Sequence, residues 1–156
     1  MRAWPSWWDV SDFVDGDRHD RSGVHRSRMN ERSRVTSGSP YESSIGFSRA
    51  VRVGKRVLVS GTAPIRPDGG CADGAGEQSR RCFEIIATAL ETVGAGLDDV
   101  VRTRIYITSA TDADAVGSVH GEIFGTARPA ATMVVVAGLL DPRWKVEIEA
   151  EAVVAD

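Results

Sequence analysis

The residues best suited to chemistry in this sequence lie in one predicted strand, KVEIEAEAVV from Lys145 to Val154. Because the side chains of a strand alternate between two faces, Glu147, Glu149 and Glu151 share one face and apolar residues occupy the other. Three carboxylates in a row are typical of a solvated sheet face. A glutamate that is partly desolvated at a subunit boundary has instead a raised pKa, which suits it to position water or move protons. The sequence leaves both interpretations open.

A second group with chemical potential is the triplet HGE, which contains His120 and Glu122. The triplet is superficially like the HxE of zinc deaminases, but those sites also need a PCxxC segment, which this sequence lacks. Cys71 and Cys82 have no CxxC spacing, so we predict free thiols and no metal site. Residues two apart on a helix do not share a face, so we expect His120 to serve in an interface and not as a partner of Glu122.

Other common signatures of enzymes are absent from the sequence. It contains no GxSxG elbow, no phosphate-binding loop and no GxGxxG fingerprint, and we expect no cofactor. Ser60 has no identifiable base in the sequence. We therefore expect Ser60 to hydrogen-bond a ligand and not to act as a nucleophile.

The charge and the apolar runs of the chain indicate whether nucleic acid or a membrane is its partner. The formal net charge of −3 provides no basic surface of the kind that nucleic acid or an anionic membrane requires. Apolar runs such as Met133 to Ala137 are far shorter than the ~20 residues of a membrane-spanning helix. We therefore expect a cytoplasmic protein that binds a small molecule.

The elements that position these residues are predicted from hydrophobic periodicity. Apolar positions recur at three and four residues in the helices, and they alternate in the strands. The order is β-β-α-β-α-β-β, with strands at 45–53 and 56–60, a helix at 77–93, a strand at 101–108, a helix at 112–124 and strands at 130–137 and 144–154. This order predicts an α+β fold, with both helices on one face of a mixed sheet. The other face then needs cover, which predicts an oligomer.

Residues 1–40 differ from the rest of the chain because they mix Arg, Asp, Ser and Gly without periodic apolar positions. We expect a disordered arm there and a single domain over residues 41–156. Trp4, Trp7 and Trp8 could dock on a partner or on a neighbouring subunit. Met29 is an alternative start, in which case the residues before it would be an artefact of start-site choice.

The chain from about Ile45 to Val154 resembles the Rid family, also called the YjgF or reactive intermediate deaminase family. The matching segments, in order, are VGKRVLVSGTAP, RTRIYIT, HGEIFG, RPAATMVVVAGL and VEIEAEAVV. The resemblance implies a chorismate-mutase-like fold and a homotrimer whose sheets form a central barrel. It also implies three ligand pockets at the subunit interfaces.

The best-known branch of that family, RidA, hydrolyses enamines and imines released by pyridoxal-phosphate enzymes, giving 2-oxo acids and ammonia. By resemblance, the catalytic glutamate that holds the attacking water falls on Glu147. The Ser-Gly pair of the second strand falls on Ser60 and Gly61. Backbone groups near Gly61 and Thr132 would then orient the substrate.

Two positions depart from the RidA pattern. Ala131 stands where RidA has an arginine that grips the substrate carboxylate, and Phe47 stands where RidA has a tyrosine. Losing a bidentate ion contact in a partly buried site is costly to binding. Arg128 could swing toward the pocket, or Arg102 or Arg104 could contribute charge from the neighbouring strand. Alternatively, the substrate lacks a carboxylate, and a pocket of Phe47, Ala131 and Met133 suits a more apolar compound.

Two functions follow from this resemblance. The first is a cofactor-independent enzyme that hydrolyses or rearranges a reactive imine or enamine, with Glu147 placing a water. The second is a non-deaminating trimer of the same fold that binds a small metabolite or a partner protein, as Ala131 and Phe47 favour.

Overall fold

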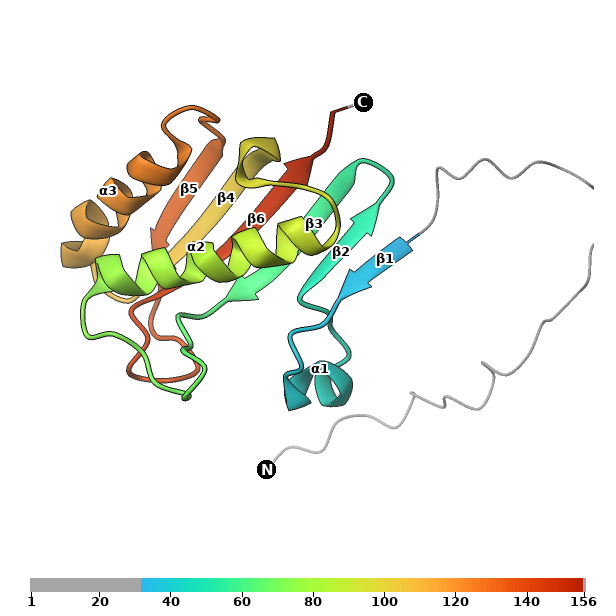
Figure 1. Cartoon of the computed structure of the whole chain (residues 1–156). Coiled ribbons are helices and arrows are strands. Elements are labelled where there is room, and N and C mark those ends of the chain that lie inside the picture. The colour runs from blue at the N-terminus through green and yellow to red at the C-terminus, as the bar shows by residue number, and fades with distance from the viewer. Residues whose placement is uncertain (1–31, 156) are drawn as a thin grey trace, which may run out of the picture.

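The predicted strands and helices form a six-stranded mixed sheet whose helices lie on one face (Figure 1). This computed structural model describes residues 32–155. In chain order its elements are β1 (Arg32–Val35), α1 (Pro40–Ile45), β2 (Ala50–Val53), β3 (Arg56–Thr62), α2 (Ala75–Thr92), the 3-10 turn η2 (Leu97–Asp99), β4 (Val100–Ile107), the 3-10 turn η3 (Ala110–Asp112), α3 (Ala113–Phe124), β5 (Ala130–Val135) and β6 (Val146–Val153). The predicted α+β fold, with two long helices on one face of a mixed sheet, is confirmed.

The prediction of a strand at 45–53 is wrong in its first half, because Ile45 ends the short helix α1 (Pro40–Ile45) and residues 46–49 form an irregular connection. The Ser39 side chain caps this helix by accepting a hydrogen bond from the Tyr41 amide at 3.3 Å. Gly46 ends it with a left-handed φ of 83°, which glycine adopts without strain. The strand begins only at Ala50.

A further strand, β1, lies inside the segment predicted to be a disordered arm. It pairs antiparallel with β2, with Val35 opposite Ala50. Ordered structure therefore begins at least nine residues before Tyr41, where the predicted domain starts. Residues 1–31 of the predicted arm, with its three tryptophans and Met29, lie outside the described residues.

The order of strands in the sheet is β1-β2-β3-β6-β4-β5. The last strand, β6, therefore lies at the centre and pairs antiparallel with both β3 and β4. β5 pairs with β4 alone and in parallel, so β1 and β5 are the edge strands within the described part of the chain. This topology brings Glu147 of β6 between two neighbouring strands.

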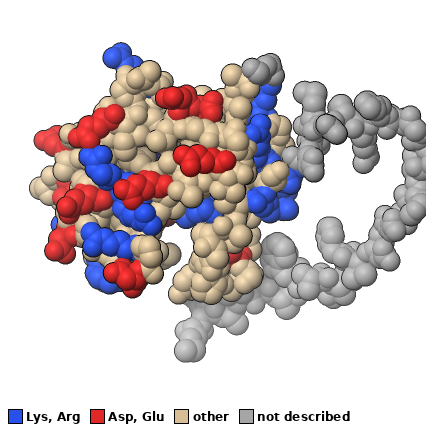
Figure 2. All heavy atoms as spheres, in the orientation of Figure 1, with Lys and Arg blue, Asp and Glu red and all other residues tan. Residues whose placement is uncertain are grey.

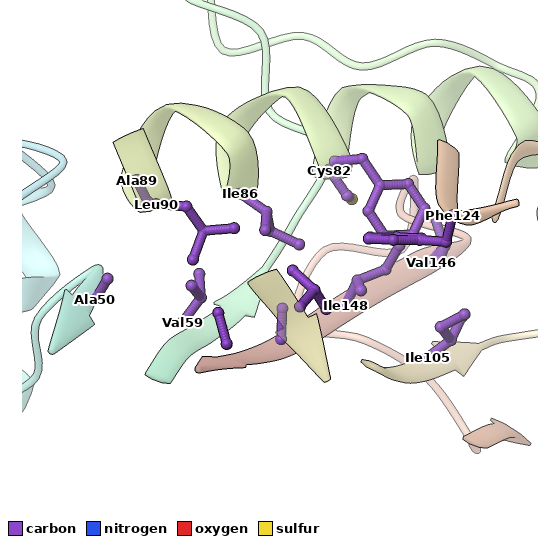
Figure 3. Close-up of a cluster of buried hydrophobic side chains, with 14 of the residues drawn as sticks. Ala50, Val59, Cys82, Ile86, Ala89, Leu90, Ile105, Phe124, Val146 and Ile148 are labelled. Carbon is purple, nitrogen blue, oxygen red and sulfur yellow. The ribbon is translucent and has the colours of Figure 1, made fainter. Parts of the chain in front are cut away.

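The core fills the space between the helices and the covered face of the sheet (Figure 3). Ile86 and Leu90 of α2 are fully buried and point toward the sheet, where Val59 of β3 and Ile148 of β6 face them. The alternating burial of β6 confirms that this strand has an apolar face and an acidic one. Within residues 32–155, no helix is long and apolar enough to cross a membrane.

Arg52 of β2 joins the first hairpin to the end of α2. Its guanidinium donates from Nη1 to the carbonyls of Val93 and Gly94, and from Nε to the carbonyl of Gly54 at 2.8 Å. The carbonyls of Val93 and Gly94 lie at the C-terminus of α2, whose last turn contains no basic residue. Arg52 therefore supplies both the hydrogen bonds and the positive charge that a helix C-terminus favours.

We expect Arg52→Met to lower the free energy of unfolding by about 1–2 kcal/mol, because these carbonyls lose a charged donor. Urea denaturation followed by circular dichroism measures the change. Arg56→Met is the matched control, since Arg56 is mostly exposed and makes one 3.4 Å ion pair with Glu151. Such exposed pairs contribute about 0–1 kcal/mol. Equal losses in the two variants would contradict the capping role.

Candidate functional site

Glu147 and Gly61 meet at an irregularity in the pairing of β3 with β6. The register shifts between Val59 and Thr62, and Gly61 lies in this bulge. The carboxylate of Glu147 packs directly over the Cα atom of Gly61, so that a Cβ atom there would lie 3.3 Å from Glu147 Cδ and would overlap Oε1. Only glycine leaves room for the carboxylate in this position.

The environment of Glu147 favours the protonated form of its side chain. Partial burial raises the pKa of this carboxyl, and the negative charge of Glu149 raises it further. The positive charge of Arg49 opposes these two effects without cancelling them. A carboxyl with a raised pKa is better able to exchange protons near neutral pH than an exposed glutamate.

Arg49 contacts the same glycine from another direction. Its Nη2 donates a hydrogen bond of 2.6 Å to the carbonyl oxygen of Gly61. Burial lowers the pKa of this guanidinium, while the charges of Glu42 and Glu147 counteract that effect. Its Nε is buried and has no hydrogen-bond partner. Gly61 is thus held beside both a desolvated carboxylate and a desolvated guanidinium, and sequence reasoning missed the second.

Ser60 is positioned as a polar neighbour and not as a nucleophile. Its Oγ donates a hydrogen bond of 2.7 Å to the carbonyl of Ser48, so its proton is committed to the backbone. Ser60 and Gly61 line a hollow of about 610 Å³ on the open face of the sheet. Phe47, in the connection between α1 and β2, is 37% exposed. Glu147 is not among the residues that line this hollow. It meets Gly61 at the bulge, and Ser60 precedes Gly61 in the chain.

The predicted residues of the RPAAT segment lie elsewhere in the same chain. Ala131 pairs with Thr103 of β4, whereas Glu147 pairs with Tyr106 on the other side of that strand. The two positions are thus separated by a whole strand and by three residues along it. Thr132 lies beside Ala131 on the exposed edge strand β5. The chain by itself does not bring these residues to Glu147.

Arg128 and Met133 also lie away from Glu147. Arg128 precedes β5 with a left-handed φ of 46°, and its Nε donates 3.1 Å to the carbonyl of Gly125. Met133 is partly buried and packs against the hydrophobic core. Within one subunit, Met133 is therefore a packing residue, and Arg128 contacts the end of α3.

The other two glutamates of β6 belong to an ion-pair network on the open face. Glu149 accepts from the Tyr106 hydroxyl at 2.9 Å and from Arg104 Nη1 at 3.3 Å. Glu151 pairs with Arg104 at 2.9 Å and with Arg56 at 3.4 Å. Glu149 and Glu151 are thus paired with basic or hydroxyl side chains, whereas Glu147 is partly desolvated within the chain itself.

His120 packs against other side chains of the same chain. Its Nε2 lies 3.0 Å from the hydroxyl of Thr103, and its ring contacts those of Phe83 and Phe124, which also contact each other. Burial lowers the pKa of this imidazole. Glu122 instead pairs with Arg80 on the exposed side of the helices, so His120 and Glu122 point apart as predicted.

Metal-binding groups are not assembled in the described part of the chain. No three His, Cys, Asp or Glu side chains within residues 32–155 lie close enough to hold a metal ion. Cys71 and Cys82 are both free thiols. Burial raises the pKa of the Cys82 thiol far above its usual range, so this cysteine is unreactive.

The fold and this site agree with a match to a known protein family. The family model described as Endoribonuclease L-PSP matches residues 38–154. The chain belongs to this family. An uncharacterized protein of Streptomyces coelicolor is 42% identical over 120 residues, which cover 76% of this chain and 90% of that protein. A RutC family protein of Pyrococcus abyssi is 37% identical over 109 residues, or 69% and 84% of the two chains.

Solved structures support the same Endoribonuclease L-PSP assignment. A member of the YjgF/YER057c/UK114 family from Mycobacterium tuberculosis is 46% identical, with a TM-score of 0.74 over 80% of this chain and 100% of that one. The YjgF gene product of Escherichia coli is 27% identical, with a TM-score of 0.64 over 69% and 87% of the two chains. The predicted membership of the YjgF (Rid) family is confirmed.

The position of Arg49 beside Gly61 and Glu147 predicts that a substitution of Arg49 changes the pKa of Glu147. We expect Arg49→Gln to raise the pKa of Glu147, because the charge that lowers this pKa is removed while an amide donor remains for the Gly61 carbonyl. Carbon-13 NMR titration of the Glu147 carboxyl measures the shift. Arg80→Gln removes an equal charge that does not act on Glu147 and is the control.

We also expect Arg49→Gln to change how the free energy of unfolding depends on pH. The pKa of Glu147 in the folded protein lies above its ordinary value. The contribution of this carboxyl to the free energy of unfolding is therefore complete at pH values below its pKa in the unfolded chain. It is lost as the pH rises through its pKa in the folded protein. In Arg49→Gln that loss should extend to higher pH. A Glu147 pKa that stays constant or falls would contradict the proximity of the two charges.

Proposed function

We propose that this protein is a cofactor-independent hydrolase of small, reactive imines or enamines, and that Glu147 holds and activates the attacking water. The observation that carries this proposal is the carboxyl of Glu147, which is partly desolvated, has a raised pKa and is packed on Gly61. Such a group is able to accept a proton in one step and return it in the next.

In the proposed reaction, Glu147 takes a proton from water as the water oxygen bonds to the imine carbon and the C=N π electrons move to nitrogen. The nitrogen takes up the proton from Glu147 to give the carbinolamine. As the carbinolamine collapses, its hydroxyl gives a proton to Glu147, which passes it to the nitrogen; the C–N bond breaks, ammonia leaves and a carbonyl group remains. An enamine first gains a proton on carbon and loses one from nitrogen to become the imine. No redox partner is needed for either route.

The pocket in this proposal lies between subunits of a homotrimer. Ser60, Gly61 and Glu147 come from one subunit, and the edge strand β5, with Ala131 and Thr132, comes from the next. The separation of these groups within one chain supports this arrangement, as does a sheet with one face free of helices. Size-exclusion chromatography with light scattering tests it, since a monomer would leave the pocket incomplete.

The assay for the proposed activity is ammonia release from 2-aminoacrylate generated in situ, compared with a set of imines that lack a carboxylate. We expect the protein to accelerate at least one of them above the rate in buffer. Acceleration of the neutral imines alone would agree with Ala131 at the position where RidA has an arginine. Failure to accelerate any substrate in the set would overturn the proposal.

A binding protein without hydrolytic activity is the second candidate, favoured by Ala131 because this residue offers no charge to a substrate. Ala131→Arg separates the two candidates. If this variant hydrolyses 2-aminoacrylate and the wild-type protein does not, the rest of the site is competent and only the anchor is missing. If neither protein hydrolyses any imine but both bind a small ligand, binding is the function.

The family description also names an endoribonuclease, and the charges of this chain do not favour that activity. The formal net charge is −3. Figure 2 shows acidic and basic side chains interspersed over the helices on the covered side of the sheet. Since RNA binding depends on a basic surface that tracks the phosphates, we propose that small molecules are the substrates.

A further inference from the structure

Tyr106 of β4 lies beside the candidate site on the open face of the sheet. It pairs directly with Glu147 across the antiparallel strands β4 and β6, and side chains paired in this way lie on one face, close to each other. Its hydroxyl, however, donates a hydrogen bond of 2.9 Å to Oε1 of Glu149, further along β6. Glu149 lines the same hollow as Ser60 and Gly61. Tyr106 thus links the position of Glu147 to a charged neighbour.

The Glu149 carboxylate is also held by Arg104, which lies directly opposite it in β4. Arg104 Nη1 donates to Oε2 of Glu149 at 3.3 Å, and the same nitrogen pairs with Oε1 of Glu151 at 2.9 Å. Arg104 thus divides one nitrogen between two carboxylates, and the shorter contact of Glu149 is with the Tyr106 hydroxyl. Because Tyr106 is the residue opposite Glu147, its hydroxyl draws the Glu149 carboxylate away from Arg104 and toward the position of Glu147.

The Tyr106 hydroxyl remains a donor throughout the neutral range of pH. Its hydrogen bond to Glu149, then slight burial and the charge of the same carboxylate, raise the pKa of this hydroxyl above its ordinary value. The charge of Glu147 raises this pKa as well, which agrees with the closeness of the two side chains. A neutral donor bound to a charged acceptor forms a bond roughly twice as strong as one between neutral groups. Near neutral pH, Tyr106 therefore holds Glu149 without carrying a charge itself.

The groups that act on Glu147 come from several elements packed around it. Partial burial raises the pKa of its carboxyl, the positive charge of Arg49 lowers this pKa, and the negative charge of Glu149 raises it. The charge of Glu147 reaches Cys82 of α2, but burial keeps this thiol neutral by raising its pKa far above the usual range. Tyr106 of β4 is likewise neutral. Among the described residues, Glu149 is therefore the neighbour whose negative charge makes Glu147 more basic.

We propose that Tyr106 is a positioning residue of this site: its hydroxyl holds the Glu149 carboxylate on the Glu147 side of Arg104, and the negative charge held there keeps Glu147 basic. The inference rests on the proposed function, in which Glu147 takes a proton from water. A more basic carboxylate takes that proton more readily. Tyr106 itself transfers no proton and touches no reacting atom in this role.

The test is Tyr106→Phe in the full-length protein, a change that removes the hydroxyl and keeps the ring. Glu149 then settles on Arg104, its remaining partner, so we expect the pKa of Glu147 to fall, as measured by carbon-13 NMR titration of its carboxyl. The acid limb of the pH profile of kcat/KM for ammonia release should move to lower pH by the same amount. The maximal kcat/KM should fall by less than about tenfold, because the variant changes the basicity of Glu147 and keeps the carboxylate itself.

Tyr41→Phe is the matched control, because Tyr41 is 65% exposed in α1 and loses the same hydroxyl. The pKa of Glu147 should keep its wild-type value in this control. In a Glu149→Gln background, Tyr106→Phe should have no further effect, since the charge that it positions is absent. An unchanged or raised pKa of Glu147 in Tyr106→Phe would overturn the proposal, and so would an equal fall in the Glu149→Gln background. A fall in a protein that hydrolyses no imine would support this role of Tyr106 and overturn the proposed function alone.

Discussion

The Glu147→Gln variant should lose roughly a hundred- to ten-thousand-fold in kcat/KM for imine hydrolysis, the range typical of a removed general base. Glutamine matches glutamate in shape and fits over Gly61, but it cannot take a proton from water. The affinity for a non-hydrolysable ligand should remain, since the pocket is otherwise unchanged. Steady-state ammonia release and calorimetric ligand binding measure the two effects separately.

Glu149→Gln provides the comparison for this prediction. Glu149 lies on the same face of β6 but is engaged by Tyr106 and Arg104, so we expect a much smaller loss of activity. Glu147→Gln should also remove the cost of holding a partly desolvated charge. Its stability should therefore match the wild type at acid pH and equal or exceed it at neutral pH. Hydrolysis that survives unchanged in Glu147→Gln would exclude this carboxyl as the base.

The second large effect is expected from Gly61→Ala, which should lower hydrolysis by about a hundredfold with little loss of stability. The added methyl group would overlap the Glu147 carboxylate, and the tip of that flexible side chain must move aside. Displacing a reacting group by about 1 Å is enough to cost roughly this factor. Kinetic assays and thermal unfolding of the same preparation separate the two quantities.

Gly121→Ala tests whether the effect is specific to position 61. Gly121 lies in α3, and a Cβ atom there has no other atom within 4 Å. This variant should keep its activity and gain about 0.5–1 kcal/mol of stability, because alanine is the better helix former. Full activity in Gly61→Ala would show that the position of the Glu147 carboxylate does not limit the reaction.

The fold was largely predictable because its two long helices and central strands have strong periodic patterns. The alternation of glutamate with apolar residues in β6 predicted its acidic and buried faces. The spacing of apolar residues predicted α2 and α3. The strand β1 was missed because its residues RSRV are mostly charged or polar, as edge strands often are. For α1, the signal was present in Ser39, Pro40 and Glu42, a capping pattern that the alternation of later residues obscured.

The candidate site was predictable only in part. Ser60, Gly61 and Glu147 come together as the resemblance implied, because β6 pairs with β3 across the bulge. Arg49 was missed, since nothing in the letters FSRA shows that its guanidinium turns inward to a carbonyl twelve residues later. The separation of Ala131 from Glu147 was also not predictable. It depends on the order of the strands in the sheet, which the residue pattern within each strand does not indicate.

The central place of β6 has a consequence for synthesis in the cell. Until β6 joins the sheet, its strands form two separate fragments, β1-β2-β3 and β4-β5, with no strand between them. The inner edges of both fragments then expose backbone donors and acceptors that are prone to pair with other chains. Emergence of β6 joins the fragments and delivers Glu147 in the same step, so a chain that stalls before this strand is both incomplete and a candidate for chaperone capture.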